Sequence, residues 1–154
     1  MTEPTSAKAD IVPYTGEFAS VVRSWIDSEE TLYFLCRGRE FPPAEDLVDS
    51  WQRPDVTSFL LFAERKPVAY GELWPRPAER AVEIAHLIVD PYKRSLGFGT
   101  KLLQLLYQQA AVRRDVGRQQ AALDRRLHMD NVARRRLDTD LGRRTEQRHE
   151  PAVL

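Results

Sequence analysis

The chain has 154 residues, 42% of them apolar and 30% charged, and its 23 basic and 23 acidic side chains balance to a net charge of zero. This composition is typical of one soluble globular domain, and it excludes wholesale disorder and the overall positive charge of a typical nucleic-acid binder. No apolar run approaches the roughly 20 residues of a membrane span, and the polar start at residues 1–4 is not a secretion signal. A cytoplasmic location is therefore expected.

The zero net charge conceals two parts of opposite charge. Residues 1–107 carry 12 basic and 16 acidic side chains, whereas residues 108–154 carry 11 basic and 7 acidic ones. All 14 aromatic residues lie at or before Tyr107, so the last third has few large side chains for a core. The single cysteine, Cys36, excludes an internal disulfide, and the scattered histidines show no zinc-binding spacing.

Hydrophobic periodicity predicts the elements of the first half of the chain. These are, in chain order, a strand at 11–14, helices at 18–26 and 31–37, helical turns at 44–52, and strands at 56–64 and 68–74. The last two strands are separated by a turn at 65–67 and are predicted to form an antiparallel hairpin. Gly38 is expected to end the second helix, and Pro75 and Pro77 are expected to end the pairing of the hairpin.

A third strand is predicted at 81–89, and because it is apolar on nearly both faces it is expected to be covered on both sides. A helix at 97–113 follows, since apolar residues then recur at helical spacing. The signals weaken beyond residue 113. Residues 120–129 fit a strand or a helix, a short helix is expected from 130 to a stop at Gly142, and residues 145–154 are expected to form a strand.

The junction between the strand at 81–89 and the following helix is the strongest chemical signal. Backbone amides at a helix start have no intrahelical partner, and together with the helix dipole they bind phosphate. Gly97 and Gly99 let the backbone approach an anion, and Lys93 and Arg94 add positive charge. The spacing matches neither the Walker nor the Rossmann glycine pattern. A helix start that needs small residues for packing is the alternative interpretation.

Residues 94–99, Arg-Ser-Leu-Gly-Phe-Gly, follow Val89-Asp90-Pro91. This segment resembles the Arg/Gln-x-x-Gly-x-Gly/Ala signature of the GNAT superfamily of N-acetyltransferases, and the resemblance is close for about residues 10–111. It implies an α/β domain of the α+β type, with a mixed, mostly antiparallel central sheet flanked by helices. The domain would occupy residues 10–154 after a flexible tail at 1–9, with 112–154 divergent from the family pattern.

The same resemblance implies that acetyl-CoA is the cosubstrate and that no metal is needed. The amides of residues 95–100 would hold its pyrophosphate, and the backbone of 87–89 would pair with its pantetheine arm like an extra strand. One strand amide would polarise the thioester. The implied binding residues are Leu87, Ile88, Val89, Arg94, Ser95, Leu96, Gly97, Phe98, Gly99, Thr100 and, further along the chain, Asn131.

Direct transfer to an amine needs a group that removes the amine proton, since a free alkyl amine has a pKa of roughly 10. Glu83, fourteen residues before Gly97, is the first candidate, because the histone-acetylating branch of the superfamily has its catalytic glutamate at this offset. Glu72, among aromatic residues on a neighbouring strand, is the second. Either carboxylate could instead be an exposed charge at a strand edge. Alternation places His86 one face away from Glu83, where a satisfied core histidine is favoured over a proton carrier.

The acceptor is expected to be a primary amine of a small molecule or peptide. Residues 28–41 are expected to shape its site, as the early helices commonly do in this superfamily. Cys36 needs no role, because direct transfer uses no enzyme nucleophile. The arginine-rich end is interpreted as a solvated helix face, so nucleic acid is an unfavoured partner; no membrane partner is expected, and a homodimer stays open.

The end of the chain departs from the family pattern. Asp138 stands where the family has a tyrosine that protonates the leaving thiolate, and Arg143 replaces the phenylalanine that follows a glycine. An ionised Asp138 could not donate that proton. The alternative to an N-acetyltransferase is therefore a catalytically weak or inactive GNAT-like module that binds acyl-CoA or a partner protein. A dimerisation domain that binds no CoA is a third interpretation.

Overall fold

The computed structural model describes residues 8–146. The chain divides into two units, residues 1–114 and 115–154, and each unit is considered by itself. The predicted tail at 1–9 falls largely outside the described residues, and its last residue, Ala9, begins a strand. In the described part of the chain, no helix is long and apolar enough to cross a membrane.

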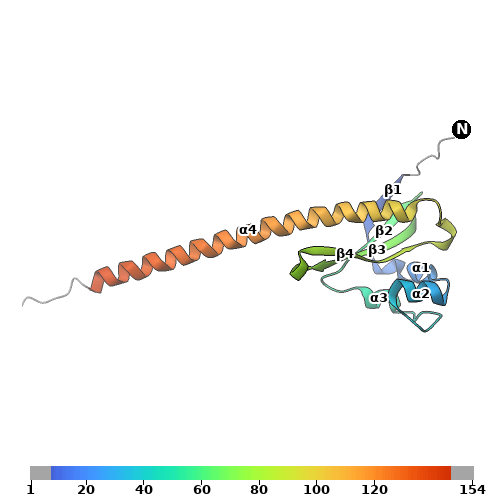
Figure 1. The fold of residues 1–154 in the computed structure, drawn as a ribbon, viewed down its shortest axis with the longest axis horizontal. Coiled ribbons are helices and arrows are strands. Elements are labelled where there is room, and N and C mark those ends of the chain that lie inside the picture. Colours follow the sequence, from blue (N-terminus) through green and yellow to red (C-terminus); the bar gives the residue numbers. More distant parts are fainter. Residues whose placement is uncertain (1–7, 147–154) are drawn as a thin grey trace, which may run out of the picture. The chain divides into compact units, whose positions relative to one another are not determined.

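The first unit is built on one antiparallel sheet (Figure 1). Its strands lie in the order β1 (Ala9–Pro13), β2 (Thr57–Ala63), β3 (Lys66–Arg76) and β4 (Ala81–Val89). The β2–β3 hairpin turns through Glu64 and Arg65, both with positive φ, which is the conformation that two-residue hairpin turns need. The predicted sheet flanked by helices is confirmed, and every strand pair among the described residues is antiparallel.

Short helices connect β1 to β2, and one long helix follows β4. The elements are the 3₁₀ turn η1 (Gly16–Phe18), α1 (Ala19–Ser24), α2 (Glu29–Cys36), α3 (Leu47–Trp51), the 3₁₀ turns η2 (Pro77–Glu79) and η3 (Pro91–Lys93), and α4 (Phe98–Glu146). Ser28 caps α2, since its hydroxyl accepts from the Thr31 amide at 3.1 Å. The left-handed residue that ends α2 is Arg37 and not the predicted Gly38. Gly38 instead allows close approach to Leu32, whose Cγ would lie 2.9 Å from an added Cβ.

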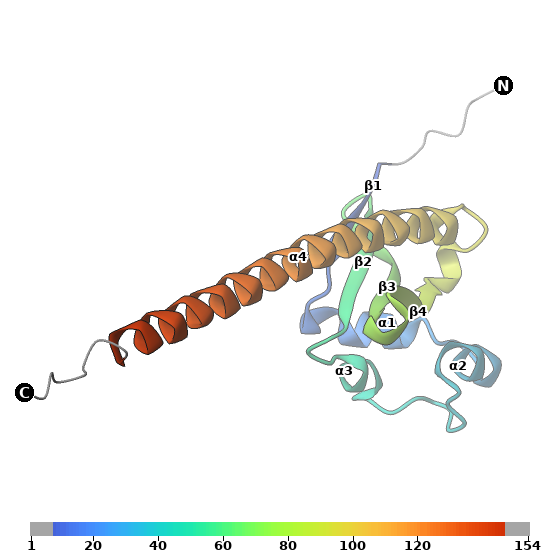
Figure 2. The same cartoon turned by 60° about the vertical axis from the view of Figure 1, so that its left-hand side comes forward.

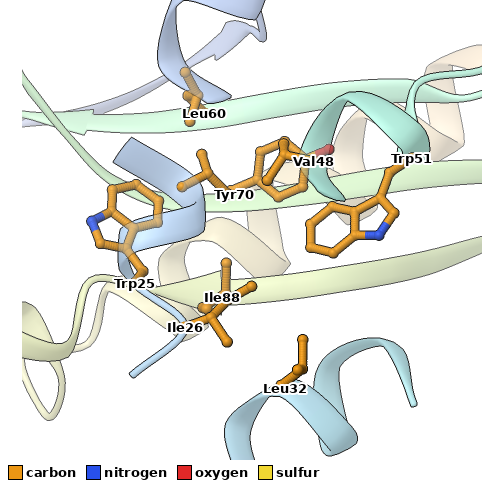
Figure 3. Packing of buried hydrophobic residues seen from close by; sticks show 9 residues of the cluster. Trp25, Ile26, Leu32, Val48, Trp51, Leu60, Tyr70 and Ile88 are labelled. Carbon is orange, nitrogen blue, oxygen red and sulfur yellow. The ribbon is translucent and has the colours of Figure 1, made fainter. Parts of the chain in front are cut away.

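Two apolar layers cover the sheet because its side chains alternate between faces. Leu60 of β2 packs beneath α1–α3, and its neighbour Leu61 packs beneath the start of α4; Figures 1 and 2 show these helices on opposite faces. The core on the α1–α3 face (Figure 3) consists of Val22, Trp25, Ile26, Leu32, Val48, Trp51, Leu60, Tyr70 and Ile88. The core on the α4 face consists of Phe59, Leu61, Ala63, Val68, Ala69, Leu73, Leu102 and Leu106.

Strand β4 lies at the edge of the sheet, since among the described residues it pairs only with β3. The prediction that both its faces are covered is wrong, because Glu83 and Leu87 are exposed and only Ile88 is fully buried. Its apolar run instead divides between two layers. Val82 and Ile84 pack partly buried against the α4 layer, whereas Ile88 belongs to the α1–α3 layer.

The pairing of β3 with β4 continues past Pro75, where an end was predicted. Pro75 lies opposite Val82, and the last pair is Arg76 with Ala81, before Pro77 begins η2. Because β2 begins at Thr57, opposite Leu73, the stretch of β3 beyond Leu73 has a strand neighbour on one side only. A proline without an N–H is tolerated at such an open side.

Helix α4 is much longer than predicted. Its start at Phe98 agrees with the predicted helix at 97–113, but it continues to Glu146. Residues 120–129 take the helical alternative, Gly142 does not end the helix, and residues 145–146 are helical where a strand was predicted. The rest of that predicted strand, 147–154, lies outside the described residues. The stretch contains no proline and is rich in arginine, leucine, glutamine and alanine, which all favour a helix.

Gly71 on β3 marks a close approach between the sheet and α4. A Cβ atom there would lie 2.8 Å from Cδ1 of the buried Leu106. Gly71→Ala is therefore expected to lower the free energy of unfolding by about 1–3 kcal/mol through overpacking, as measured by urea denaturation. Gly16→Ala is the matched control, because nothing lies within 4 Å of a Cβ at the exposed Gly16. Equal effects of the two substitutions would contradict the tight packing at Gly71.

Candidate active site

The segment that joins β4 to α4 presents a run of unpaired backbone amides. Asp90 is the first residue of this segment. Its carboxylate accepts a hydrogen bond from the Tyr92 amide at 3.0 Å and caps the turn η3. The first hydrogen bond of α4 runs from the Lys101 amide to the Gly97 carbonyl, at 3.0 Å. Within the described residues, the amides of 95–100 therefore donate to no protein acceptor, which is the arrangement that an anion site needs.

Gly97 and Gly99 are glycines for different reasons. Gly97 has a left-handed backbone, with φ of 86°, and a Cβ there would meet nothing within 4 Å. A Cβ at Gly99 would lie 3.4 Å from the Val89 side chain. Packing therefore explains Gly99, whereas Gly97 makes a turn and leaves open space beside the free amides. A pyrophosphate fits this loop by its chemistry, because amide donors and a helix start both favour an anion.

Arg94 begins the loop and carries its positive charge. The Arg94 guanidinium lies 3.5 Å from the Asp27 carboxylate, and both side chains are partly exposed. An exposed ion pair of this kind contributes little stability. Arg94 can therefore exchange Asp27 for a phosphate group at little cost.

Strand β4 carries a bulge a few residues before this loop. Tyr70 of β3 pairs with Ile88, but Glu72 pairs with Ala85, so β4 holds one extra residue at this point. His86 lies within the bulge and has a left-handed backbone, with φ of 46°. A bulge locally disrupts the ladder and re-aims a side chain, so His86 does not follow the regular alternation of the strand.

Glu83, the first predicted base, lies opposite Trp74 of β3 and is 47% exposed. Its carboxylate accepts from Nε of Arg76 at 2.8 Å, and this hydrogen bond raises the pKa of the Arg76 guanidinium. Trp74 also contacts the His86 ring edge-on, so Glu83 and His86 share one face of the sheet. The prediction that alternation separates them is wrong, because the bulge changes the alternation between them. The catalytic role of Glu83 stays a prediction.

Glu72, the second predicted base, is fully buried, with 0% of it exposed. Its Oε1 accepts from the Tyr70 hydroxyl at 2.6 Å, and its Oε2 accepts from the Trp74 indole at 2.5 Å and lies 3.0 Å from His86 Nδ1. Burial and the adjacent carboxylate raise the pKa of Tyr70, so its hydroxyl stays protonated and donates. Glu72 is therefore the centre of a buried polar network and not an exposed edge charge.

The network continues from Tyr70 toward α3. Gln52 donates from Nε2 to the Tyr70 hydroxyl at 2.9 Å, and its Oε1 accepts from the Ser58 hydroxyl at 2.8 Å. Trp51 stacks on the His86 ring, with their centroids 4.2 Å apart. The sequence interpretation missed Trp51, Gln52 and Ser58, because these contacts depend on how α3 docks on the sheet and leave no local pattern.

The region predicted to shape the acceptor site, residues 28–41, forms α2 and the loop after it. Three of its aromatic rings are exposed, namely Tyr33, Phe34 and Phe41, and Phe34 is 70% exposed. Cys36 in the same helix is half-buried, and its thiol donates to the Leu32 carbonyl at 3.4 Å. The exposed rings are available to a ligand, whereas the thiol packs against the core.

A known family has the same motif and fold. The model of the acetyltransferase (GNAT) family matches residues 20–137, which is more than half of the chain. The chain belongs to the GNAT acetyltransferase family. No match was found among curated proteins.

Several solved structures share the fold of this GNAT domain. An acetyltransferase from Thermus thermophilus is 23% identical, with a TM-score of 0.52 over 65% of this chain and 68% of that one. The ribosomal-protein-S18-alanine N-acetyltransferase from Escherichia coli is 19% identical, with a TM-score of 0.50 over 69% of this chain and 61% of that one. A GNAT acetyltransferase from Staphylococcus aureus is 16% identical, with a TM-score of 0.51 over 69% and 68%. At these identities the likeness shows the fold alone.

The GNAT family match ends inside the second unit. It includes Asn131, which lies in α4, and the contact of Asn131 with a pantetheine arm stays a prediction. Asp138 and Arg143, where the chain departs from the GNAT pattern, lie in the same helix just beyond the matched residues.

Proposed function

We propose that this GNAT domain transfers the acetyl group of acetyl-CoA to a primary amine of a small molecule or peptide, by direct attack of the amine on the thioester. The observation that carries the proposal is the run of unpaired amides at 95–100, around the left-handed turn at Gly97. These amides follow an edge strand that carries a bulge, so an anion site and a free strand edge lie together in the chain.

Acetyl-CoA would be held by backbone groups of two segments. The amides of residues 95–100 would hold the pyrophosphate, and Arg94 would add positive charge. The backbone of residues 87–89 would pair with the pantetheine arm, since the outer edge of β4 has no strand neighbour among the described residues. A backbone amide near the bulge would polarise the thioester carbonyl.

The transfer forms a bond between the amine nitrogen and the acetyl carbon, breaks the bond between that carbon and sulfur, and releases a thiolate. The amine must lose a proton, because a free alkyl amine has a pKa of roughly 10. We assign Glu83 the role of positioning a water that takes this proton from the ammonium form before attack. Glu72 is fully buried and would act through the groups that are hydrogen-bonded to it. Cys36 is half-buried and is given no role as a nucleophile.

A GNAT-like module that binds acyl-CoA or a partner protein without catalysis is the second candidate function. Asp138 favours it, because a carboxylate stands in place of the tyrosine that would protonate the leaving thiolate. An enzyme and an acyl-CoA-binding module would both bind acetyl-CoA. Only the enzyme would release free thiol from acetyl-CoA in the presence of an amine.

Isothermal titration with acetyl-CoA tests the binding step separately from the chemistry. A saturable signal is expected with the whole chain, because the free amides of 95–100 and the open edge of β4 need no rearrangement to receive it. The absence of a saturable signal at millimolar acetyl-CoA would contradict the proposed function.

Glu83→Gln is expected to lower turnover about tenfold, since one hydrogen bond to a charged group contributes about 1.5 kcal/mol. Acetyl-CoA affinity is expected to stay unchanged, because Glu83 lies outside the loop at 95–100. Thiol release measured across pH checks the turnover, and isothermal titration with acetyl-CoA checks the affinity. Glu79→Gln is the matched control, since Glu79 is an exposed carboxylate in the neighbouring turn η2. Unchanged turnover in Glu83→Gln would remove Glu83 from the mechanism.

A further inference from the structure

We propose that His86 accepts the proton that the amine nitrogen loses as it bonds to the acetyl carbon, with Glu72 as the buried positioning residue of His86. This inference rests on the proposed function and names the acceptor atom, Nε2 of His86. His86 lies at the bulge of β4, immediately before the backbone of 87–89 that would hold the pantetheine arm. A proton acceptor at this point in the chain adjoins the segment to which the thioester is assigned.

The contact with Glu72 fixes the protonation pattern of the imidazole. Nδ1 of His86 lies 3.0 Å from Oε2 of Glu72, and the carboxylate already accepts from Tyr70 and Trp74. Because an ionised carboxylate is an acceptor only, the hydrogen-bond network assigns the proton to Nδ1. Nε2 then carries the lone pair that a base needs.

Two indole rings hold the imidazole in place. Trp51 stacks on it at 4.2 Å between centroids, with an interplanar angle of 27°. Trp74 meets it edge-on at 5.2 Å, with an interplanar angle of 85°. Trp51 therefore contacts one face of the imidazole, Trp74 packs edge-on against it, and Glu72 contacts its Nδ1. These three contacts fix the direction of Nε2, which is the preorganisation that a base requires.

The side chains of His86 and Glu72 differ in their exposure to solvent. The side chain of His86 is 12% exposed and that of Glu72 is 0% exposed. Nε2 of His86 has no protein partner among the described residues, and the one side-chain polar atom there that is both buried and unpartnered is the Tyr14 hydroxyl. Nε2 is therefore not fully buried, so of these two groups His86 is the one that is exposed to an incoming amine.

The charged and titratable groups around the His86 ring come from β3 and from the loop after α3. Glu72 and Tyr70 are linked to the ring through the hydrogen-bond network. The guanidinium groups of Arg53 and Arg76 lie over the Trp74 ring, at 4.7 and 5.8 Å from its centroid. Glu72 is thus the carboxylate in direct contact with the imidazole, and it would stabilise the imidazolium that forms during transfer.

During the transfer, His86 accepts one proton and later returns it, so the protons of the reaction balance. As the amine nitrogen bonds to the acetyl carbon, its proton passes to Nε2, and the bond between carbon and sulfur breaks to give a thiolate. The imidazolium then returns the proton to that thiolate, which yields the amide and free thiol and restores the neutral imidazole. His86 would in this way supply the acid that an ionised Asp138 cannot supply.

His86→Asn is the variant that removes Nε2 and little else. The asparagine amide can donate toward Glu72 as Nδ1 does, and asparagine tolerates the left-handed backbone of this position. We expect kcat to fall about 100-fold and the acidic limb of its pH profile to disappear, since that limb reports protonation of the base. KM for acetyl-CoA should not change. His128→Asn, at an exposed histidine of the second unit, is the matched control and should leave both unchanged.

Three outcomes are distinguishable. An active wild type whose His86→Asn variant keeps its kcat and its acidic limb would overturn the role of His86 but not the proposed function. A wild type that releases no thiol with any amine would overturn both. Nitrogen NMR of the imidazole in the wild-type protein needs no activity and no variant: a protonated Nδ1 with an unprotonated Nε2 at neutral pH supports the proposal, and the reverse tautomer overturns it.

Discussion

Gly97→Glu is expected to weaken acetyl-CoA binding at least about 100-fold, which corresponds to about 2.8 kcal/mol. Gly97 lies among the unpaired amides of 95–100, so a carboxylate there would place negative charge where the pyrophosphate is proposed to bind. The new carboxylate would also accept hydrogen bonds from the same amides and would repel the pyrophosphate. Isothermal titration of the purified variant measures the loss.

Two control variants separate charge from backbone strain. Gly97→Ala introduces the strain of a side chain at φ of 86° without a charge, and a smaller loss of affinity is expected. Gly16→Glu adds a carboxylate at an exposed glycine with nothing within 4 Å of its Cβ, and no loss is expected. A folded Gly97→Glu variant that binds acetyl-CoA as tightly as the wild type would contradict the assignment of the loop.

Glu72→Gln is expected to lower the free energy of unfolding by about 3 kcal/mol and the melting temperature by roughly 10 °C. The substitution conserves size but replaces one carboxylate oxygen with an amide NH₂ group. The carboxylate accepts from Tyr70, Trp74 and His86, so at least one donor would then face another donor in a fully buried site. A buried donor without an acceptor is strongly destabilising.

The matched control for this prediction is Glu83→Gln. It makes the same chemical change on the adjacent strand, but Glu83 is 47% exposed and paired with Arg76 at the surface. Exposed ion pairs contribute roughly 0–1 kcal/mol, so a small shift is expected. Urea denaturation of both variants gives the comparison. Equal destabilisation would show that the network around Glu72 adds no stability beyond a surface pair.

The elements that local sequence signals mark were predicted close to their observed bounds. The strand predicted at 81–89 has the same bounds as β4, because a proline–arginine segment precedes its apolar run and Asp90-Pro91 follows it. The helix predicted from Gly97 begins at Phe98, where the spacing of apolar residues changes to that of a helix. The turn between them, which carries the proposed anion site, was therefore visible in the sequence.

Other features of the structure could not be predicted, because they depend on contacts between elements that no local sequence pattern encodes. The bulge at His86 arises from the register between β3 and β4, so counting alternate residues placed His86 on the wrong face. Glu72 was named as a candidate base, but His86 meets it only through the bulge of β4, and Gln52 joins its network only when α3 docks on the sheet. The length of α4 was missed because two leucines four residues apart, Leu123 and Leu127, fit a strand face as well as a helix face.

A screen of primary amines with detection of free thiol tests most directly whether the protein transfers the acetyl group of acetyl-CoA to an amine. The whole chain should release thiol from acetyl-CoA only when an accepted amine is present, and Gly97→Glu should abolish this release. Mass spectrometry of the accepted amine should show one added acetyl group. Saturable binding of acetyl-CoA without amine-dependent thiol release from any amine would contradict catalysis and leave the binding module as the function of this chain.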